Sequence, residues 1–182
     1  FRQAGINTVV VPMACQAPHF ASFLKAIFTL DNTRGALITM PHKVSVVGLL
    51  DELSAAVRVA GACNAVRRAA DGRLIGDMFD GAGFVRGVLR KGFALAGKRA
   101  LVVGTGGVGS AIAASLAGAE VATISLFDVN TAACEALAQR LRENHPRIEV
   151  RTGSADPAGQ DLVVNATPMG MNDGDPLPID VA

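Results

Sequence analysis

Two titratable side chains stand at the ends of apolar segments, where a fold can present them to a ligand. Lys43 closes the stretch GALITMPHK (35–43), and Asp80 opens the segment DGAGF (80–84). A lysine beside a carboxylate can exchange a proton with a substrate hydroxyl, which is the chemistry that accompanies hydride transfer to or from a carbonyl. From spacing alone, however, Lys43 as a solvated residue at a helix start and Asp80 as a helix N-cap are the simpler interpretations.

A second candidate site is the segment VVGTGGVGSA, in which three glycines have the spacing G-x-G-x-x-G. The segment follows a continuous apolar stretch, RALVV (99–103), and precedes apolar residues at helical spacing, which is the context that a dinucleotide-binding turn requires. Glycines permit the tight turn and the close approach of a pyrophosphate, and the N–H groups of the new helix face the anion. The residues expected to contact a dinucleotide cofactor here are Gly104, Gly106, Gly107, Val108 and Gly109.

An acidic residue, Asp128, ends the next apolar segment. A carboxylate at this position can accept hydrogen bonds from the adenosine ribose hydroxyls and repels a 2′-phosphate. Val129 and Asn130 follow, and no arginine is near. The sequence therefore predicts that NAD is preferred, with NADP not excluded. A simpler role for Asp128, in capping the helix that begins near Asn130, is compatible with this one.

The elements that must position these residues alternate between strands and helices. Apolar patterns predict strands at 7–13, 35–40, 62–66, 73–76, 99–103, 121–128, 148–150 and 161–167. They predict helices at 20–28, 44–50, 84–89, 108–116 and 133–141, and one capped by Asp51 that continues through Val59. Strands that alternate with helices favour an α/β fold with a parallel sheet. The pattern changes between residues 80 and 96, which indicates two lobes with a cleft between them.

The composition excludes several classes of protein. Half of the 182 residues are hydrophobic and 18% are charged, which is typical of a folded chain rather than a disordered one. The net charge is +1 and the basic residues are scattered, so we expect no nucleic-acid partner. No apolar run reaches the ~18 residues of a membrane span and no leader opens the chain, so a cytoplasmic protein is expected. Three cysteines and three histidines lack metal-ligand spacing, and no metal site is predicted.

Several stretches together resemble the shikimate dehydrogenase family, in which they occur in the same order and at similar separations. They are GALITMPHK (35–43), AGACNAV (60–66), DGAGF (80–84), VGTGGVG (103–109) and VNATPMGM (164–171). The resemblance implies a two-lobed α/β protein, with an N-terminal substrate-binding domain at 1–84 and a Rossmann-type dinucleotide-binding domain at 85–182. It also implies an oxidoreductase that moves a hydride between a nicotinamide cofactor and a small cyclic hydroxy acid, such as shikimate or quinate. A homodimer is compatible with this assignment.

The resemblance assigns roles to individual residues. It implies that Lys43 and Asp80 form the catalytic pair, with Lys43 as general acid and base. Thr39 and Asn64 would line the substrate site. The loop 165–171 would lie beside the cofactor, with Thr167 near the nicotinamide. The residues of this loop expected to bind the cofactor are Asn165, Thr167 and Met169.

The chain departs from the family pattern at three places. Leu37 stands where the family has Asn, and Met78-Phe79 where it has Asn-Thr. Each lost donor should cost about 1–3 kcal/mol of affinity for shikimate if the site is buried. Asp128-Val129-Asn130 replaces the Asn-Arg-Thr that reads a 2′-phosphate. We therefore expect the chemistry to be kept and the substrate and cofactor preferences to differ.

Two other interpretations of the function remain open. A nucleotide-binding sensor or partner protein without catalysis is favoured by the apolar replacements. Another two-lobed dinucleotide enzyme, such as a folate-linked dehydrogenase, would lack its own motifs here.

Compared with the family pattern, the chain begins inside the first helix and ends before the closing strands and helices. We therefore expect both domains to be truncated.

Overall fold

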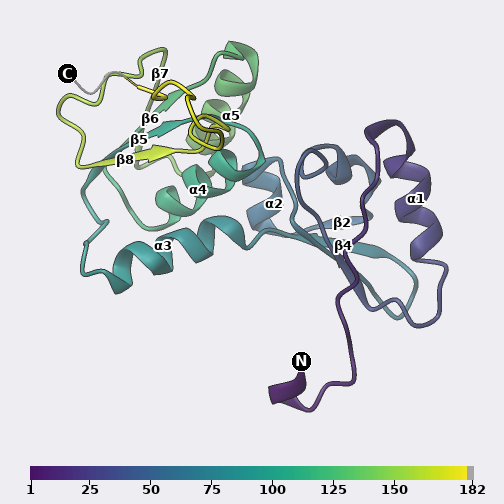
Figure 1. The fold of residues 1–182 in the computed structure, drawn as a ribbon. Coiled ribbons are helices and arrows are strands. Elements are labelled where there is room, and N and C mark those ends of the chain that lie inside the picture. The colour runs from purple at the N-terminus through teal and green to yellow at the C-terminus, as the bar shows by residue number, and fades with distance from the viewer. Residues whose placement is uncertain (180–182) are drawn as a thin grey trace. The chain divides into compact units, whose positions relative to one another are not determined.

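The computed structural model describes residues 1–179, which belong to two compact units, Phe1–Thr33 and Arg34–Ala182 (Figure 1). The first unit contains two short 3-10 helices, η1 (Arg2–Ala4) and η2 (Ala17–His19), and the helix α1 (Phe20–Ile27). Phe20 and Leu24 are the buried residues of α1, one turn apart, as the apolar spacing predicted.

The strand predicted at 7–13 is wrong. The segment contains no strand, and Val9, Val10 and Val11 are all well over half exposed. Valine favours an extended backbone, but a strand also needs a neighbour for its N–H and C=O groups. No described residue pairs with this segment.

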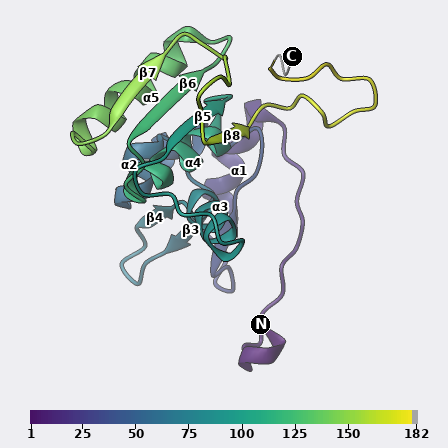
Figure 2. The same cartoon turned by 90° about the vertical axis from the view of Figure 1, so that its left-hand side faces the viewer.

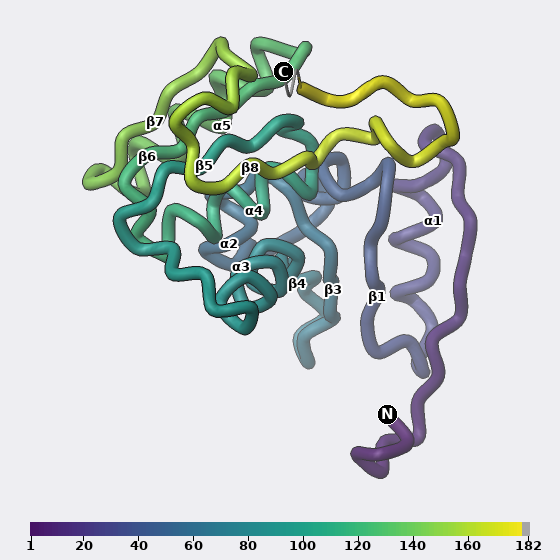
Figure 3. The backbone as a smooth tube through the Cα atoms, turned by 60° about the vertical axis from the view of Figure 1, so that its left-hand side comes forward, coloured from purple at the N-terminus to yellow at the C-terminus, as the bar shows by residue number. Residues whose placement is uncertain are grey.

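The second unit begins with a four-stranded sheet. Its strands are β1 (Gly35–Leu37), β2 (Glu52–Leu53), β3 (Ala65–Arg68) and β4 (Leu74–Asp77), in the order β1-β3-β4-β2. β3 is antiparallel to both of its neighbours, which run beside it in Figure 3, and β2 is parallel to β4. The predicted hairpin is confirmed, with the turn AADG at 69–72 and Gly72 at a φ of 89°.

Two predictions between β1 and β3 need correction. The helix expected at 44–50 is a 3-10 helix, η3 (Ser45–Leu49). Asp51 does not cap the next helix, because its carboxylate accepts a hydrogen bond from the N–H of Leu74 instead. The following helix is α2 (Ala55–Ala60), and its N-cap is Ser54, whose hydroxyl accepts from the N–H of Val57 at 3.2 Å. The pairing of β2 with β4 occupies the residues that the sequence pattern assigned to the helix start.

A second sheet is entirely parallel, as predicted. Its strands are β5 (Arg99–Val103), β6 (Thr123–Phe127), β7 (Glu149–Thr152) and β8 (Leu162–Asn165), in the order β7-β6-β5-β8 (Figures 1 and 2). Helix α4 (Gly107–Gly118) joins β5 to β6, and α5 (Thr131–Asn144) joins β6 to β7. Val103 aligns with both Phe127 and Asn165, so the segments that follow three strands meet at one edge of the sheet.

The helices of this unit pack against one another. α2 packs against both α4 and α5, and α3 (Asp80–Arg90) packs along α4. Gly81 allows α3 and α4 to approach each other closely, since a Cβ on it would lie 2.0 Å from the carbonyl oxygen of Ala111. The buried cluster includes apolar residues of β5, β6, α4 and α5, together with Val59 of α2. In the part of the chain that the structure describes, no helix has the length and apolar character to cross a bilayer.

Candidate active site

The predicted pair, Lys43 and Asp80, is in direct contact. Lys43 Nζ lies 2.6 Å from Asp80 Oδ2, and the two side chains are 13% and 29% exposed. The other carboxylate oxygen of Asp80 accepts a hydrogen bond of 2.6 Å from Asn64 Nδ2. The amide oxygen of Asn64 in turn accepts the N–H of Phe79 at 3.0 Å. Because both oxygens of Asp80 are engaged, its carboxylate is held in one orientation.

Backbone hydrogen bonds between neighbouring segments bring these residues together. The N–H of Ile38, just after β1, donates to the carbonyl of Asn64, and the N–H of Asn64 donates to the carbonyl of Asp77. Asn64 is therefore fixed between the ends of β1 and β4. The N–H of Cys63 donates to the carbonyl of Lys43 at 2.8 Å, which ties the lysine loop to the same place. The interpretation of Asp80 as the N-cap of this helix is wrong, because Asp80 is the first residue of α3.

The glycine-rich loop after β5 has the tight geometry that its spacing predicted. Gly104 has a φ of 95°, and a Cβ on it would lie 2.8 Å from the carbonyl carbon of Ala166. A Cβ on Gly109 would lie 1.8 Å from the carbonyl oxygen of Gly104. Neither position can take a side chain without a backbone shift, and the turn therefore requires both glycines.

The remaining glycines of the loop have different surroundings. Gly106, the N-cap of α4, has open space where a Cβ would stand, next to the free N–H groups of the first helical turn. This arrangement fits a pyrophosphate. A Cβ on Gly107 would lie 2.9 Å from Cβ of Lys43. The candidate catalytic lysine therefore lies against the start of the helix that would hold the cofactor.

Asp128 follows β6 and accepts three hydrogen bonds. The N–H and hydroxyl of Thr105 donate to Oδ2, and the N–H of Asn130 donates to Oδ1 at 2.8 Å. Burial acts to raise the pKa of Asp128, but the hydrogen bonds from Thr105 and Asn130 together hold that pKa below its ordinary value. Asn130 is the N-cap of α5, since its side chain accepts from the N–H of Ala133. A carboxylate has about four lone-pair positions, so Asp128 can still accept from a ribose hydroxyl.

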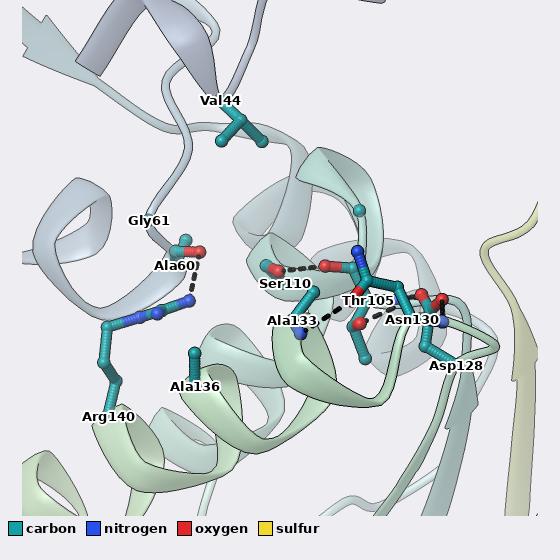
Figure 4. Close-up of a pocket in the computed structure, with 11 residues that line it drawn as sticks. Val44, Ala60, Gly61, Thr105, Ser110, Asp128, Asn130, Ala133, Ala136 and Arg140 are labelled. Carbon is teal, nitrogen blue, oxygen red and sulfur yellow. Dashed lines mark hydrogen bonds between the residues drawn. The ribbon is translucent and has the colours of Figure 1, made fainter. Parts of the chain in front are cut away.

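An open cleft of about 490 Å³ adjoins Asp128 (Figure 4). Thr105, Gly106 and Ser110 line it beside the glycine loop. Arg140 of α5 and Ala60 at the end of α2 line it away from Asp128. The cleft therefore lies next to both the candidate ribose-binding carboxylate and the candidate pyrophosphate site.

The loop after β8 is held by its own side chains. Asn165 Oδ1 accepts from the N–H and hydroxyl of Thr167, and Asn165 Nδ2 donates to the carbonyl of Met169 at 2.9 Å. Ala166, which lies between Asn165 and Thr167 in the chain, contacts Gly104 and Gly109. Asn165 and Thr167 therefore lie next to the glycine loop. A contact of Asn165, Thr167 or Met169 with a cofactor stays a prediction.

The residues predicted to line the substrate site differ in their exposure. Thr39 is exposed and lies one turn before Lys43 in the same loop, and its carbonyl accepts the N–H of His42. Among the apolar replacements, Leu37 is 76% exposed and Phe79 is 57% exposed, whereas Met78 is only 5% exposed. Met78 is therefore a core residue, and of these three replacements only Leu37 and Phe79 have exposed apolar surface.

Two residues that contribute to the site were not found from the sequence. Thr105 occupies a variable position of the glycine pattern, yet it fixes the carboxylate of Asp128. Arg140 contacts the end of α2 about 80 positions earlier in the chain, and no local pattern could indicate that contact. Within residues 1–179, no cluster of three or more His, Cys, Asp or Glu side chains could hold a metal ion.

Known proteins resemble the chain in sequence and in fold. A family model for the shikimate dehydrogenase substrate binding domain matches residues 1–66. The shikimate dehydrogenase (NADP(+)) of Rubrobacter xylanophilus is 36% identical over 181 residues, which cover 98% of this chain and 63% of the relative. The quinate/shikimate dehydrogenase (NAD(+)) of Corynebacterium efficiens is 41% identical over 143 residues, covering 75% of this chain and 50% of the relative.

A solved structure agrees with the fold. The ligand-free 5-ketofructose reductase of a Gluconobacter strain has a TM-score of 0.79 and 29% identity, covering 98% of this chain and 65% of that protein. The chain thus spans less than two thirds of each of these relatives. The motifs at 35–43 and 103–109, the α/β architecture with its parallel sheet, and the sequence similarity agree. The chain belongs to the shikimate dehydrogenase family.

Proposed function

We propose that this protein is a nicotinamide-dependent dehydrogenase that acts on a secondary alcohol or ketone of a small cyclic hydroxy acid. The observation that carries the proposal is the contact of Lys43 with Asp80 at 2.6 Å, directly beside Gly107 of the cofactor loop. Residues 1–84 would hold the substrate and residues 85–182 the cofactor.

In the proposed reaction, Lys43 moves the proton that must accompany the hydride. Its ammonium group donates a proton to the carbonyl oxygen during reduction, and its amine accepts the hydroxyl proton during oxidation. Asp80 orients the lysine and can accept a hydrogen bond from a second substrate hydroxyl. Asn64 keeps Asp80 in place through the 2.6 Å hydrogen bond. The nicotinamide, when bound, supplies or receives the hydride.

We propose NAD as the preferred cofactor. The support is Asp128, whose carboxylate stands where a 2′-phosphate would be repelled, and the apolar Val129, which is 93% exposed and offers no charge to such a phosphate. Most of the curated relatives, the Rubrobacter protein among them, are named for NADP, whereas the Corynebacterium protein is named for NAD. Sequence similarity alone therefore does not decide between the two cofactors.

The substrate is proposed by class. Shikimate and quinate are the first candidates because relatives are named for them. Exposed apolar side chains at Leu37 and Phe79 favour a substrate with a less polar edge than shikimate has. A 5-ketofructose reductase has the same fold, so the fold itself is compatible with more than one substrate.

A sensor or partner protein without catalysis is the second candidate function. The same two residues, Leu37 and Phe79, favour it, because they could contact a different ligand or a protein surface. The intact Lys43–Asp80–Asn64 network argues against it, since a protein that only binds nucleotides has no need of this network.

The test is a screen for cofactor reduction with cyclic hydroxy acids, with NAD and NADP measured in parallel. We expect turnover of at least one acid and a higher kcat/KM with NAD than with NADP. A clear preference for NADP would contradict the role given to Asp128. Cofactor binding without turnover of any acid in the panel would favour the sensor function.

A further inference from the structure

We propose that Arg140 is a positioning residue, whose guanidinium fastens the end of α2 to α5 and thereby holds Lys43 against the start of α4. This inference rests on the proposed role of Lys43 in catalysis. Arg140 is remote from Lys43 in sequence and donates only to the backbone of α2. Its effect on the reaction would therefore be exerted through the chain that links α2 to Lys43.

Arg140 satisfies carbonyl groups that the helix itself leaves free. Its Nε donates to the carbonyl of Val59 at 2.9 Å, and Nη2 donates to the carbonyl of Ala60 at 3.2 Å, as the dashed line in Figure 4 marks for Ala60. The last carbonyls of a helix have no intrahelical N–H partner, and a guanidinium can serve two of them at once. The contact is partly buried and joins two elements about 80 residues apart, so it is a tertiary contact and not a local cap.

Gly61 permits this approach. It ends α2 at a φ of 66°, which favours glycine, and its N–H donates to the carbonyl of Val57 at 2.7 Å. A Cβ at this position would lie 2.9 Å from Nη2 and 3.1 Å from Cζ of Arg140. Any larger residue would push the guanidinium away from the end of the helix.

A short buried segment leads from this contact to the lysine. Ala62 and Cys63 follow Gly61 directly, and neither has any exposed surface. The N–H of Cys63 donates to the carbonyl of Lys43. A Cβ on Gly107 would lie 2.9 Å from Cβ of Lys43 and 3.7 Å from Cβ of Ala62, so both residues pack beside the first turn of α4.

The geometry explains why a movement at Arg140 would reach the reacting atoms. If the end of α2 moved away from α5, Ala62 and Cys63 would move with it, and the carbonyl of Lys43 would follow. A displacement of about 1 Å at a catalytic group can lower a rate about 100-fold. Arg140 is therefore expected to influence kcat through the position of Lys43.

The test compares Arg140→Met with a matched control on the same helix. Arg142 also donates from Nη2 to a backbone carbonyl, that of Val150 in β7, at 2.9 Å. Arg142→Met removes an equivalent hydrogen bond without touching α2. We expect Arg140→Met to lower kcat at least about tenfold, Arg142→Met to leave kcat unchanged, and Arg140→Lys to recover part of the loss. A kcat for Arg140→Met equal to that of Arg142→Met would overturn the proposal.

Hydrogen exchange gives a second readout that does not need turnover. The amide of Cys63 is protected by its bond to Lys43, and it should exchange faster in Arg140→Met than in wild type or Arg142→Met. Equal exchange in all three proteins would overturn the proposed positioning role. If wild type turned over no acid, the proposed function would fail, but this comparison would still decide whether Arg140 holds the lysine loop.

A further variant disturbs the same contact from the α2 side. It can be used if Arg140→Met does not fold. Gly61→Ala should raise exchange at Cys63 because its methyl group displaces the guanidinium. Gly92→Ala is the control, since Gly92 also has a positive φ, 82°, but nothing lies within 4 Å of its Cβ position. Faster exchange at Cys63 in Gly61→Ala alone would support the proposal, and equal exchange in the two variants would contradict it.

Discussion

The carboxylate of Asp80 is held in one orientation by two neighbouring side chains. One oxygen faces Lys43 and the other faces Asn64, so its orientation is set from two directions. Asp128 is fixed in the same way by Thr105 and Asn130. At both positions the acidic residue type could be read from the sequence. The neutral side chains that orient the two carboxylates could not be predicted, because a hydrogen bond from Asn64 or Thr105 leaves no periodic pattern in the sequence.

Asp128 should make stability depend on pH in acid. Its pKa in the folded protein is below the ordinary value of 3.8, so its contribution is present above that value and is lost as pH falls through the folded pKa. We expect the difference in free energy of unfolding between wild type and Asp128→Asn to be largest near neutral pH. It should narrow below about pH 4.

Urea unfolding of both proteins from pH 7 to pH 3 measures this difference. Asp31→Asn, an exposed substitution in the first unit, controls for the change in net charge. A difference between wild type and Asp128→Asn that stayed constant over this range would mean that the hydrogen bonds to Asp128 do not stabilise its charged form.

Phe79 should influence which acid is accepted. The family pattern has a threonine at this position, and Phe79 is exposed and directly precedes Asp80 in the chain. Phe79→Thr restores a hydroxyl, so we expect kcat/KM for shikimate to rise about 5- to 150-fold, which corresponds to one hydrogen bond of roughly 1–3 kcal/mol. Met78→Leu, a substitution of similar volume at a buried position, should leave kcat/KM for shikimate unchanged. An unchanged kcat/KM for shikimate in Phe79→Thr as well would remove Phe79 from substrate recognition.

At the scale of elements, α4 is the centre of the arrangement. Its first turn carries the glycine loop, and α2 and α3 both pack against it. β5, the glycine loop and α4 could be predicted in full because a continuous apolar strand and a glycine spacing are local signals. β2 and the true start of α2 could not, because the parallel pairing of Glu52 with Ile75 competes with the helical pattern. The strand predicted at 7–13 failed for a related reason, since pairing partners are not encoded locally.

The packing of α3 on α4 depends on Gly81. A Cβ there would lie 2.0 Å from the carbonyl oxygen of Ala111 and 2.3 Å from Oγ of Ser115. Gly81→Ala should therefore destabilise the protein by about 1–3 kcal/mol, the usual cost of overpacking. Gly87→Ala is the control, since Gly87 lies in the same helix with nothing within 4 Å of its Cβ position, and it should stabilise by up to about 1 kcal/mol. Thermal or urea unfolding measures both, and equal stability of the two variants would refute the close contact.

At the scale of the molecule, the unit Arg34–Ala182 contains both sheets and every residue of the Lys43–Asp80–Asn64 network. The glycine loop and Asp128 belong to the same unit, so the candidate proton-transferring pair and the candidate cofactor site lie in one compact unit. The α/β organisation with a parallel sheet could be predicted from the alternation of strands and helices. The contact between Lys43 and Gly107 could not, because it depends on how α2 packs against α4.

Lys43, as the group that moves the proton, is the central residue of the proposed mechanism. The decisive measurement is the kcat of Lys43→Met on the substrate found by the screen, together with its affinity for NADH. Because the chain has neither Trp nor Tyr, bound NADH can be followed by its own fluorescence with little protein background. Lys98→Met is the control, since Lys98 pairs with Asp161 next to the start of β5, at the opposite end of that strand from the glycine loop.

We expect Lys43→Met to lose at least about 100-fold in kcat, the usual contribution of a general acid or base, while its NADH affinity stays that of wild type. Lys98→Met should keep both values. A kcat for Lys43→Met equal to that of wild type would contradict the proposed mechanism.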